Sequence, residues 1–224
     1  MMDWSPIFIS MKTASLSILI TFFIGLIVAW GIVKMKNDKI KIALDSVFTL
    51  PLVLPPTVVG FFVLWIFGVR GPIGRFFIDF FTVKIAFSWY ATVIAAVVMS
   101  FPLMYRSARG AFEQVDTNLL DAGRTLGMSE WKIFWKVLFA NALPGIISGG
   151  ILAYARGLGE FGATAMLAGN IAGQTRTLPM AVYSDVAAGN MGNAFNYVVV
   201  IVVIAFIAIS IMDYVAIRQD RQWK

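Results

Sequence analysis

The feature that most constrains this chain is a set of long apolar runs that contain no Asp, Glu, Lys or Arg. A helix needs about 20 apolar residues to cross the hydrocarbon core of a bilayer. Five runs are of about this size: residues 14–33, 46–69, 85–105, 137–155 and 186–212. The sequence therefore predicts an all-α integral membrane protein with about five transmembrane helices.

The composition agrees with this class. Hydrophobic residues make up 59% of the chain and charged residues 13%, which leaves too little polar surface to cover a soluble globule. The chain has no cysteine and no histidine, so disulfides, zinc-thiolate sites and histidine-based triads cannot underlie an activity. The net charge of +6 does not require a nucleic-acid partner, because membrane proteins collect Lys and Arg on their cytoplasmic side. We expect contact with membrane lipid, no nucleic acid and no metal.

A shorter uncharged run, residues 161–175, is interrupted by glycines such as Gly162 and Gly169. Its length and its glycines favour a re-entrant or outer-face segment, with a sixth span as the alternative. The first run, 14–33, ends without a small-residue cleavage site, so we expect it to be retained as a helix. No segment is long enough to fold as a soluble domain, and we interpret residues 1–224 as a single transmembrane domain.

The positive charges predict how the chain crosses the membrane. With the N-terminus outside, the inner segments contain twelve of the eighteen Lys and Arg residues, and such an excess is typical of the cytoplasmic side. These inner charges are Lys34, Lys36, Lys39, Lys41, Arg106, Arg109, Arg124, Lys132, Lys136, Arg218, Arg221 and Lys224. We therefore predict a multi-pass protein of the cytoplasmic membrane, with its N-terminus outside and its C-terminus inside. The longest inner loop covers residues 106–136.

The pattern of this inner loop predicts a helix, a sharp turn and a second helix. Asp116 or Thr117 can cap a short helix over residues 118–126, and Gly127 suits the left-handed residue that ends it. Ser129 then offers a second N-cap, from which another helix leads toward the membrane. The loop is thus expected to be structured.

The first helix of the loop carries two adjacent small residues, Ala122 and Gly123, between Asp121 and Arg124. Small residues create a surface on which another protein can approach the backbone closely. The residues alone equally allow an amphipathic helix that lies on the membrane surface.

The motif Asp121-Ala122-Gly123, followed after three residues by Gly127, resembles the cytoplasmic EAA loop of ABC importer permeases. Asp121 stands where that family has Glu, and Gly123 stands where it has a second Ala. The resemblance implies that this loop forms the coupling helix, which sits in a cleft on the ATPase subunit. The coupling residues it implies are Asp121, Ala122, Gly123, Arg124, Leu126 and Gly127.

Longer stretches narrow the resemblance to molybdate permeases of this class. They are LPLVLPPTVVG at 50–60, FSW at 87–89, MSFPL at 99–103 and RGLGEFGAT at 156–164. The resemblance implies the fold of a type I ABC importer permease in a bacterial or archaeal membrane. It also implies molybdate import by a pair of identical permease chains, with an extracytoplasmic molybdate-binding protein that delivers the anion and separate ATPase subunits that use ATP.

The chain itself has no GxxxxGK[ST] pattern that could cradle nucleotide phosphates. We therefore expect a transport subunit that is not an enzyme and binds no cofactor of its own.

Several other functions remain open at this point. Sulfate or tungstate could replace molybdate as the substrate, since the GEFG segment at 159–162 is also similar to sulfate permeases. A secondary transporter driven by an ion gradient would need no ATPase, but the uncharged spans offer few proton-relay carboxylates. An intramembrane hydrolase lacks a convincing catalytic set.

The second predicted span contains Pro51, Pro55 and Pro56, followed by Thr57. Each proline removes a backbone donor and can kink the helix. Irregular backbone at membrane depth is tolerated where it lines a cavity or the protein interior. These residues are candidates for the substrate pathway or its gate, and a role in packing alone is the alternative.

Arg156 and Glu160 are four residues apart, so on one helix they share a face and can form an ion pair. A stabilising pair at a helix end is the simpler interpretation. A role for Arg156 in attracting an oxyanion is the second hypothesis, because charges close to a span are often functional.

Overall fold

The computed structural model describes residues 3–220, and for residues 212–213 and 215–220 it describes the backbone only. The helices are α1 (Ser5–Val33), α2 (Asp38–Val53), α3 (Pro56–Phe67), α4 (Pro72–Phe81), α5 (Trp89–Glu113), α6 (Thr117–Thr125), α7 (Glu130–Ile133), the π-helix η1 (Phe134–Phe139), α8 (Ala140–Leu158), α9 (Gly162–Leu167), α10 (Leu178–Ala187) and α11 (Met191–Asp220). Arg218, Arg221 and Lys224, which were counted as inner charges, lie outside the residues whose side chains are described.

Within residues 3–220, four continuous helical segments are long and apolar enough to cross a membrane. They are α1, α5, the continuous stretch Glu130–Leu158 and the α11 segment Met191–Ile211. The fifth predicted span is the pair α2 and α3, which passes the same test only as one bent unit. The prediction of an all-α membrane protein with about five spans is therefore confirmed.

The second span is broken more severely than a proline kink requires. The axes of α2 and α3 differ by 115° across the break. Leu54, which precedes Pro55, has the extended conformation (φ −73°, ψ 142°) that a following proline imposes. Pro55 and Pro56 then supply two consecutive residues without an N–H, so α2 cannot continue past Val53.

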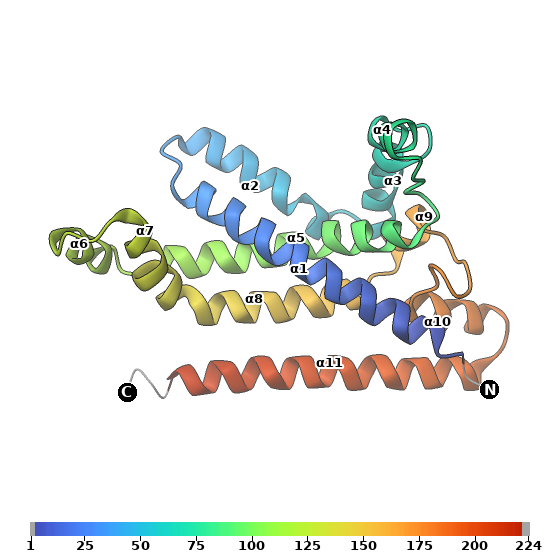
Figure 1. Cartoon of the computed structure of the whole chain (residues 1–224). Coiled ribbons are helices and arrows are strands. Elements are labelled where there is room, and N and C mark those ends of the chain that lie inside the picture. Colours follow the sequence, from blue (N-terminus) through green and yellow to red (C-terminus); the bar gives the residue numbers. More distant parts are fainter. Residues whose placement is uncertain (1–2, 221–224) are drawn as a thin grey trace.

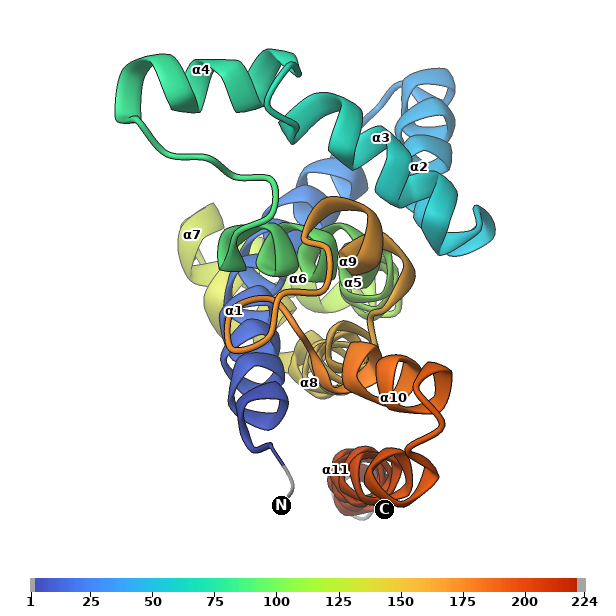
Figure 2. The same cartoon turned by 90° about the vertical axis from the view of Figure 1, so that its right-hand side faces the viewer.

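The core forms where α1, α5 and α8 lie side by side (Figure 1). Ala29, Tyr105 and Ile146, one from each of these helices, are fully buried there. On one side of this layer, α2 lies against α5, and α3 lies against α9 with α4 beyond it; α11 lies along the opposite side (Figures 1 and 2).

Hydroxyl groups pair between α1 and α5 inside this apolar core. The hydroxyls of Thr13 and Thr92 lie 2.9 Å apart, and those of Thr21 and Ser100 lie 3.2 Å apart. All four residues are buried. In a medium without water such groups need partners within the protein, and here they find them across the helix pair.

The uncharged run 161–175 does not form a sixth span. Its only helix is α9, which has six residues, far fewer than a span needs. It packs against α3 and α5, where Val59, Ala95 and Leu167 form a second buried cluster.

The two ends of the bundle are built differently. The N-terminal end of α1, together with α4, α9 and α10, lies at one end, called here the α4 end (Figure 1). The helices α6 and α7 project from the opposite end, called the α6 end. The candidate functional residues fall into two groups, one at each of these ends.

Candidate functional site at the two ends of the bundle

The loop at the α6 end has the helix, turn and helix that the sequence predicts. The side chain of Asp116 accepts a hydrogen bond from the backbone N–H of Asn118 at 2.9 Å, so Asp116 is the cap and Thr117 the first helical residue. Gly127 has φ +72°, a conformation that glycine adopts at little cost. The Ser129 side chain accepts from the N–H of Lys132 at 3.4 Å and caps α7.

Arg124 fixes the two helices of the loop relative to one another. Its guanidinium lies 2.6 Å from Asp121 on α6 and 2.8 Å from Glu130 on α7. The hydrogen bond to Glu130, and then the one to Asp121, raise the pKa of Arg124 above its ordinary value. The guanidinium thus joins the two sides of the turn through its carboxylate partners.

The two small residues of α6 have different surroundings. Ala122 is exposed, whereas Gly123 is buried and faces the bundle. A Cβ at Gly123 would lie 3.2 Å from Cγ1 of Ile133. The small size of Gly123 thus serves the packing of α6 on α7, and its part in a contact with another protein stays a prediction. The exposed tip of the loop is Leu126, which is 80% exposed.

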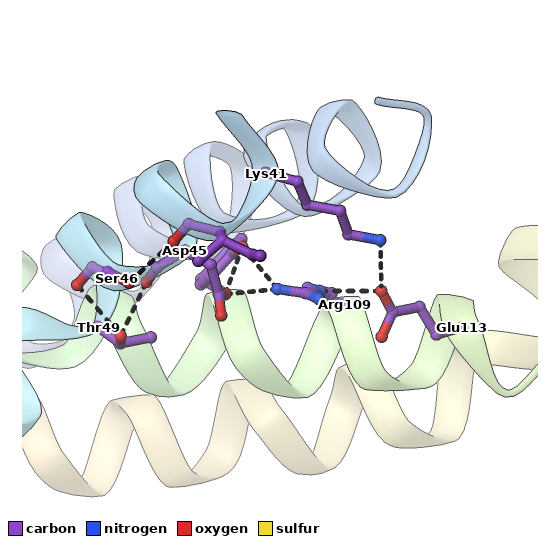
Figure 3. Close-up of polar contacts among 8 residues, drawn as sticks. Lys41, Asp45, Ser46, Thr49, Arg109 and Glu113 are labelled. Atoms are coloured by element: carbon purple, nitrogen blue, oxygen red, sulfur yellow. Dashed lines mark hydrogen bonds and ion pairs between the residues drawn. The ribbon is translucent and has the colours of Figure 1, made fainter. Parts of the chain in front are cut away.

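A cluster of charged residues fastens α2 to the end of α5 that leads into α6 (Figure 3). The Arg109 guanidinium lies 2.5 Å from Asp45 and 2.9 Å from Glu113. Lys41 donates to Glu113 at 3.2 Å, and the Tyr105 hydroxyl donates to Asp45 at 2.9 Å. These five residues are called the α2–α5 ion cluster. Glu113 is three residues before Asp116, so the broken span is tied to the base of the loop.

The sequence pattern did not predict this cluster. Arg109 was counted only among the positive charges that indicate the cytoplasmic side. A signal was present, because Lys41 and Asp45, and likewise Arg109 and Glu113, are four residues apart and so share a helix face. Figure 3 also draws Ser46 and Thr49, whose hydroxyls donate to the carbonyl oxygens of Ile42 and Asp45 on their own helix.

Near the α4 end, the start of α3 lies directly against the start of α9. A Cβ at Gly162 would lie 2.7 Å from Cβ of Pro56 and 3.3 Å from the backbone N of Thr57. A Cβ at Gly60 would come within 2.8 Å of Cα of Ala163. Glycine is needed at both positions because the two backbones approach so closely. We call this contact the α3–α9 junction.

Glu160 organises the other side of the α3–α9 junction. Its carboxylate is 2% exposed, lies 2.6 Å from the Arg156 guanidinium and accepts the backbone N–H of Ala163 at 2.8 Å. The predicted ion pair between Arg156 and Glu160 is confirmed, and Glu160 also satisfies a donor in the first turn of α9. Attraction of an anion by Arg156 stays a prediction.

The pathway candidates came from two parts of the sequence, the proline segment 51–57 and the ion pair at 156–160. Except for Pro51, these candidates lie close together in the structure. Pro56 and Thr57 lie at the α3–α9 junction with Glu160, whose partner is Arg156. Pro55 caps α3, whereas Pro51 lies inside α2, before the break. Among residues 3–220, no group of three or more His, Cys, Asp or Glu side chains could hold a metal ion.

Residues 21–221 match the family described as "Binding-protein-dependent transport system inner membrane component", and the chain belongs to this family. It is therefore the multi-pass permease component of an ABC transporter of the inner membrane and not its ATPase, whose hydrolysis of ATP is general for the family. This membership excludes the ion-coupled transporter and the intramembrane hydrolase.

Individual relatives narrow the comparison. The chain is 43% identical to the molybdenum transport system permease protein ModB of Escherichia coli (strain K12), over 96% of this chain and 93% of that protein. It is 42% identical to the putative molybdenum transport system permease protein YvgM of Bacillus subtilis (strain 168), over 91% of this chain and 89% of that one.

Solved structures confirm the predicted ABC importer permease fold. An inward-facing MetNI methionine ABC transporter matches with a TM-score of 0.67 and 18% identity, over 94% of both chains. A bacterial ABC transporter involved in the import of the acidic polysaccharide alginate matches with a TM-score of 0.70 and 14% identity, over 94% of this chain and 78% of that one.

Proposed function

We propose that this chain is the permease subunit through which a molybdate importer moves its substrate across the cytoplasmic membrane. The observation that carries the proposal is the 43% identity over 96% of the chain to a molybdenum transport permease. A relative of a second organism, again named for molybdenum transport, matches over 91% of the chain. Such continuous similarity includes both ends of the bundle and the pathway between them.

The α6 end faces the cytoplasm in this proposal and the α4 end faces outward. The excess of Lys and Arg on the α6 side supports this orientation, because positive charges are retained on the cytoplasmic side. A molybdate-binding protein would then deliver the anion to the α4 end. Two copies of the chain, related by a two-fold axis, would enclose the pathway between them.

The exposed tip of α6 is the contact that we assign to the ATPase. Leu126 offers an apolar side chain that is 80% exposed, and Arg124 holds the turn beside it through Asp121 and Glu130. A rigid apolar tip can transmit a push when the ATPase subunits close. The Ala122 face supports a close approach, since its side chain is small and exposed.

Motion of the loop would reach the pathway through α5 and α2. Asp116 begins the loop three residues after Glu113, and Arg109 joins Glu113 to Asp45 on α2. The other end of α2 is the break that leads to Pro56 and the α3–α9 junction. We assign the gate to this junction, where Gly162 lies against the first turn of α3 and Glu160, paired with Arg156, holds the first turn of α9.

The decisive experiment is uptake of labelled molybdate by cells that carry the complete transporter. Leu126→Asp should abolish uptake and copurification of the ATPase while the permease still inserts, because a carboxylate cannot enter an apolar cleft without a large desolvation cost. Met35→Asp is the matched control, since it puts the same charge on a half-exposed apolar residue at the same end. Normal uptake by Leu126→Asp would contradict the assignment of the coupling contact.

The substrate is tested separately by competition. Excess unlabelled molybdate should suppress uptake more strongly than equal amounts of tungstate or sulfate. If sulfate competes best, the chain serves a sulfate importer, and if tungstate competes best, it serves a tungstate importer.

A further inference from the structure

The helix α4 lies across the direction of the spanning helices. In Figure 1 it is seen nearly end-on, while α1, α5, α8 and α11 run lengthwise across the view. In Figure 2, turned by 90°, α5, α8 and α11 are seen nearly end-on and α4 runs across the view. It connects α3 to the irregular segment 82–88 that leads into α5 at the α4 end. Its axis therefore lies close to the plane of the membrane, near the ends of the spans.

The side chains of α4 divide it into an apolar face and a polar face. All but one of its large apolar residues recur at the three- and four-residue spacing that places them on one side of a helix; they are Ile73, Phe76, Phe77, Phe80 and Phe81, and the exception is Ile78. Arg75 and Asp79 lie on the opposite side, 3.7 Å apart. The helix is thus strongly amphipathic although it has only ten residues.

The apolar face has no cover within the described part of the chain. Phe76, Phe80 and Phe81 are 49%, 73% and 59% exposed. Their rings pack on one another, with centroids 4.7 Å apart for Phe76 and Phe80 and 6.2 Å apart for Phe76 and Phe81. The rings therefore form one continuous aromatic surface, which we call the α4 aromatic face.

The orientation of α4 is fixed by the turn that precedes it. A Cβ at Gly74 would overlap the carbonyl oxygens of Phe67 and Gly68, and one at Gly71 would overlap that of Trp65. The glycines allow the backbone to fold tightly onto the end of α3. The angle between α3 and α4 is thus part of the fold.

The charges around α4 favour an anionic surface. Residues 70–84 contain three cations, Arg70, Arg75 and Lys84, and one acidic residue, Asp79, which gives a net charge of +2. Basic residues beside an aromatic face are the composition of helices that rest in the headgroup region of a bilayer. Each Lys or Arg near an anionic lipid surface adds to the attraction.

We propose that α4 is an interfacial helix that binds the surface of the outer leaflet, with the α4 aromatic face in the boundary between headgroups and acyl chains and with Arg70, Arg75 and Lys84 on phospholipid phosphates. The outward position of α4 rests on the orientation given in the proposed function. Because α4 follows α3 through a tight turn, this contact holds the end of α3 at a fixed depth. The α3–α9 junction can then move against an anchored helix.

The test uses the complete transporter reconstituted in vesicles of phosphatidylcholine, with or without phosphatidylglycerol. The chain contains no cysteine, so the variants Phe80→Cys and Asp79→Cys each provide a single site for a nitroxide label. Electron paramagnetic resonance then measures collisions of the label with oxygen, which concentrates in lipid, and with a nickel chelate, which stays in water.

We expect the ratio of oxygen to nickel collisions to be several-fold higher at Phe80→Cys than at Asp79→Cys, and to rise at Phe80→Cys when phosphatidylglycerol is added. The rise should disappear when Arg70, Arg75 and Lys84 are all replaced by Gln. A label at Phe80→Cys that is shielded from both reagents would overturn the proposal and assign the face to a second copy of the chain. Equal access of both labels to nickel would also overturn it, as would a ratio that does not depend on lipid charge.

Molybdate uptake into the same vesicles is measured in parallel. It is measured with the unsubstituted chain, in which α4 is unchanged, so a failure of the proposed function can be told from a failure of the lipid contact of α4.

Discussion

The ion pair between Arg109 and Asp45 should contribute measurably to the stability of this protein. A fully exposed ion pair contributes up to about 1 kcal/mol, whereas a pair inside one ion-pair network can show a coupling energy of up to about 3 kcal/mol. The side chains of Arg109 and Asp45 are 21% and 26% exposed and belong to the α2–α5 ion cluster, so the second case is the closer one. We expect an interaction of about 2 kcal/mol, which corresponds to a factor of about 30 in the unfolding equilibrium.

A double-mutant cycle isolates this interaction from the other effects of each substitution. Its members are Asp45→Asn, Arg109→Gln and the double variant. The free energy of unfolding is measured in mixed micelles titrated with sodium dodecyl sulfate, with far-ultraviolet circular dichroism as the signal. Lys39→Gln is the control, because Lys39 is an exposed lysine of the same helix and forms no ion pair with the described residues.

The reasoning fails if the coupling energy is below about 0.5 kcal/mol, the size expected for fully exposed pairs. It also fails if Lys39→Gln lowers the stability as much as Arg109→Gln does. Either result would mean that α2 is held against α5 by apolar packing and that the ion cluster is incidental.

Three further substitutions test the local geometry by the same unfolding measurement. Gly162→Ala should lower the free energy of unfolding by about 1–3 kcal/mol through overpacking against Pro56 and should slow molybdate uptake. Gly110→Ala is the control and should not lower it, because a Cβ there meets nothing within 4 Å. Equal effects of the two substitutions would contradict the close contact. Gly127→Val should cost about 1–2 kcal/mol because φ is +72°, and an unchanged stability would show that the turn relaxes. Asp116→Ala should cost about 1 kcal/mol through loss of the cap, and Asp116→Asn should restore most of it; no loss with Ala would argue against the cap.

The parts of the fold that depend on neighbouring residues could be predicted from the sequence. The capping of α6 by Asp116 and the left-handed Gly127 follow from interactions within a few residues. The number of spans follows from the length of the apolar runs. Hydropathy does not indicate the direction of a helix axis, however. The bend of 115° within the run 46–69 is therefore indicated only by its prolines.

The parts that depend on distant partners could not be predicted in this way. Asp45 and Arg109 are 64 residues apart in the sequence, and nothing in the local pattern pairs them. The burial of Gly123 against Ile133 could not be predicted, because the sequence does not tell which side of a short helix faces the rest of the chain. The helix α4 was missed because its charges divide a short apolar segment, so a search for long uncharged runs passes over it.

The hydroxyl pairs between α1 and α5 have a consequence for biosynthesis. Thr13 and Thr92 are 79 residues apart in the sequence, and so are Thr21 and Ser100, which means that the two helices run in the same direction in strict register. A slip of one helical turn would unpair both contacts at once. During translation α1 leaves the ribosome long before α5, so its hydroxyls must bond to their own helix, as Ser17 does to the carbonyl oxygen of Ala14, until the partner helix arrives. The order of synthesis thus makes α1 a template that selects the correct depth of α5.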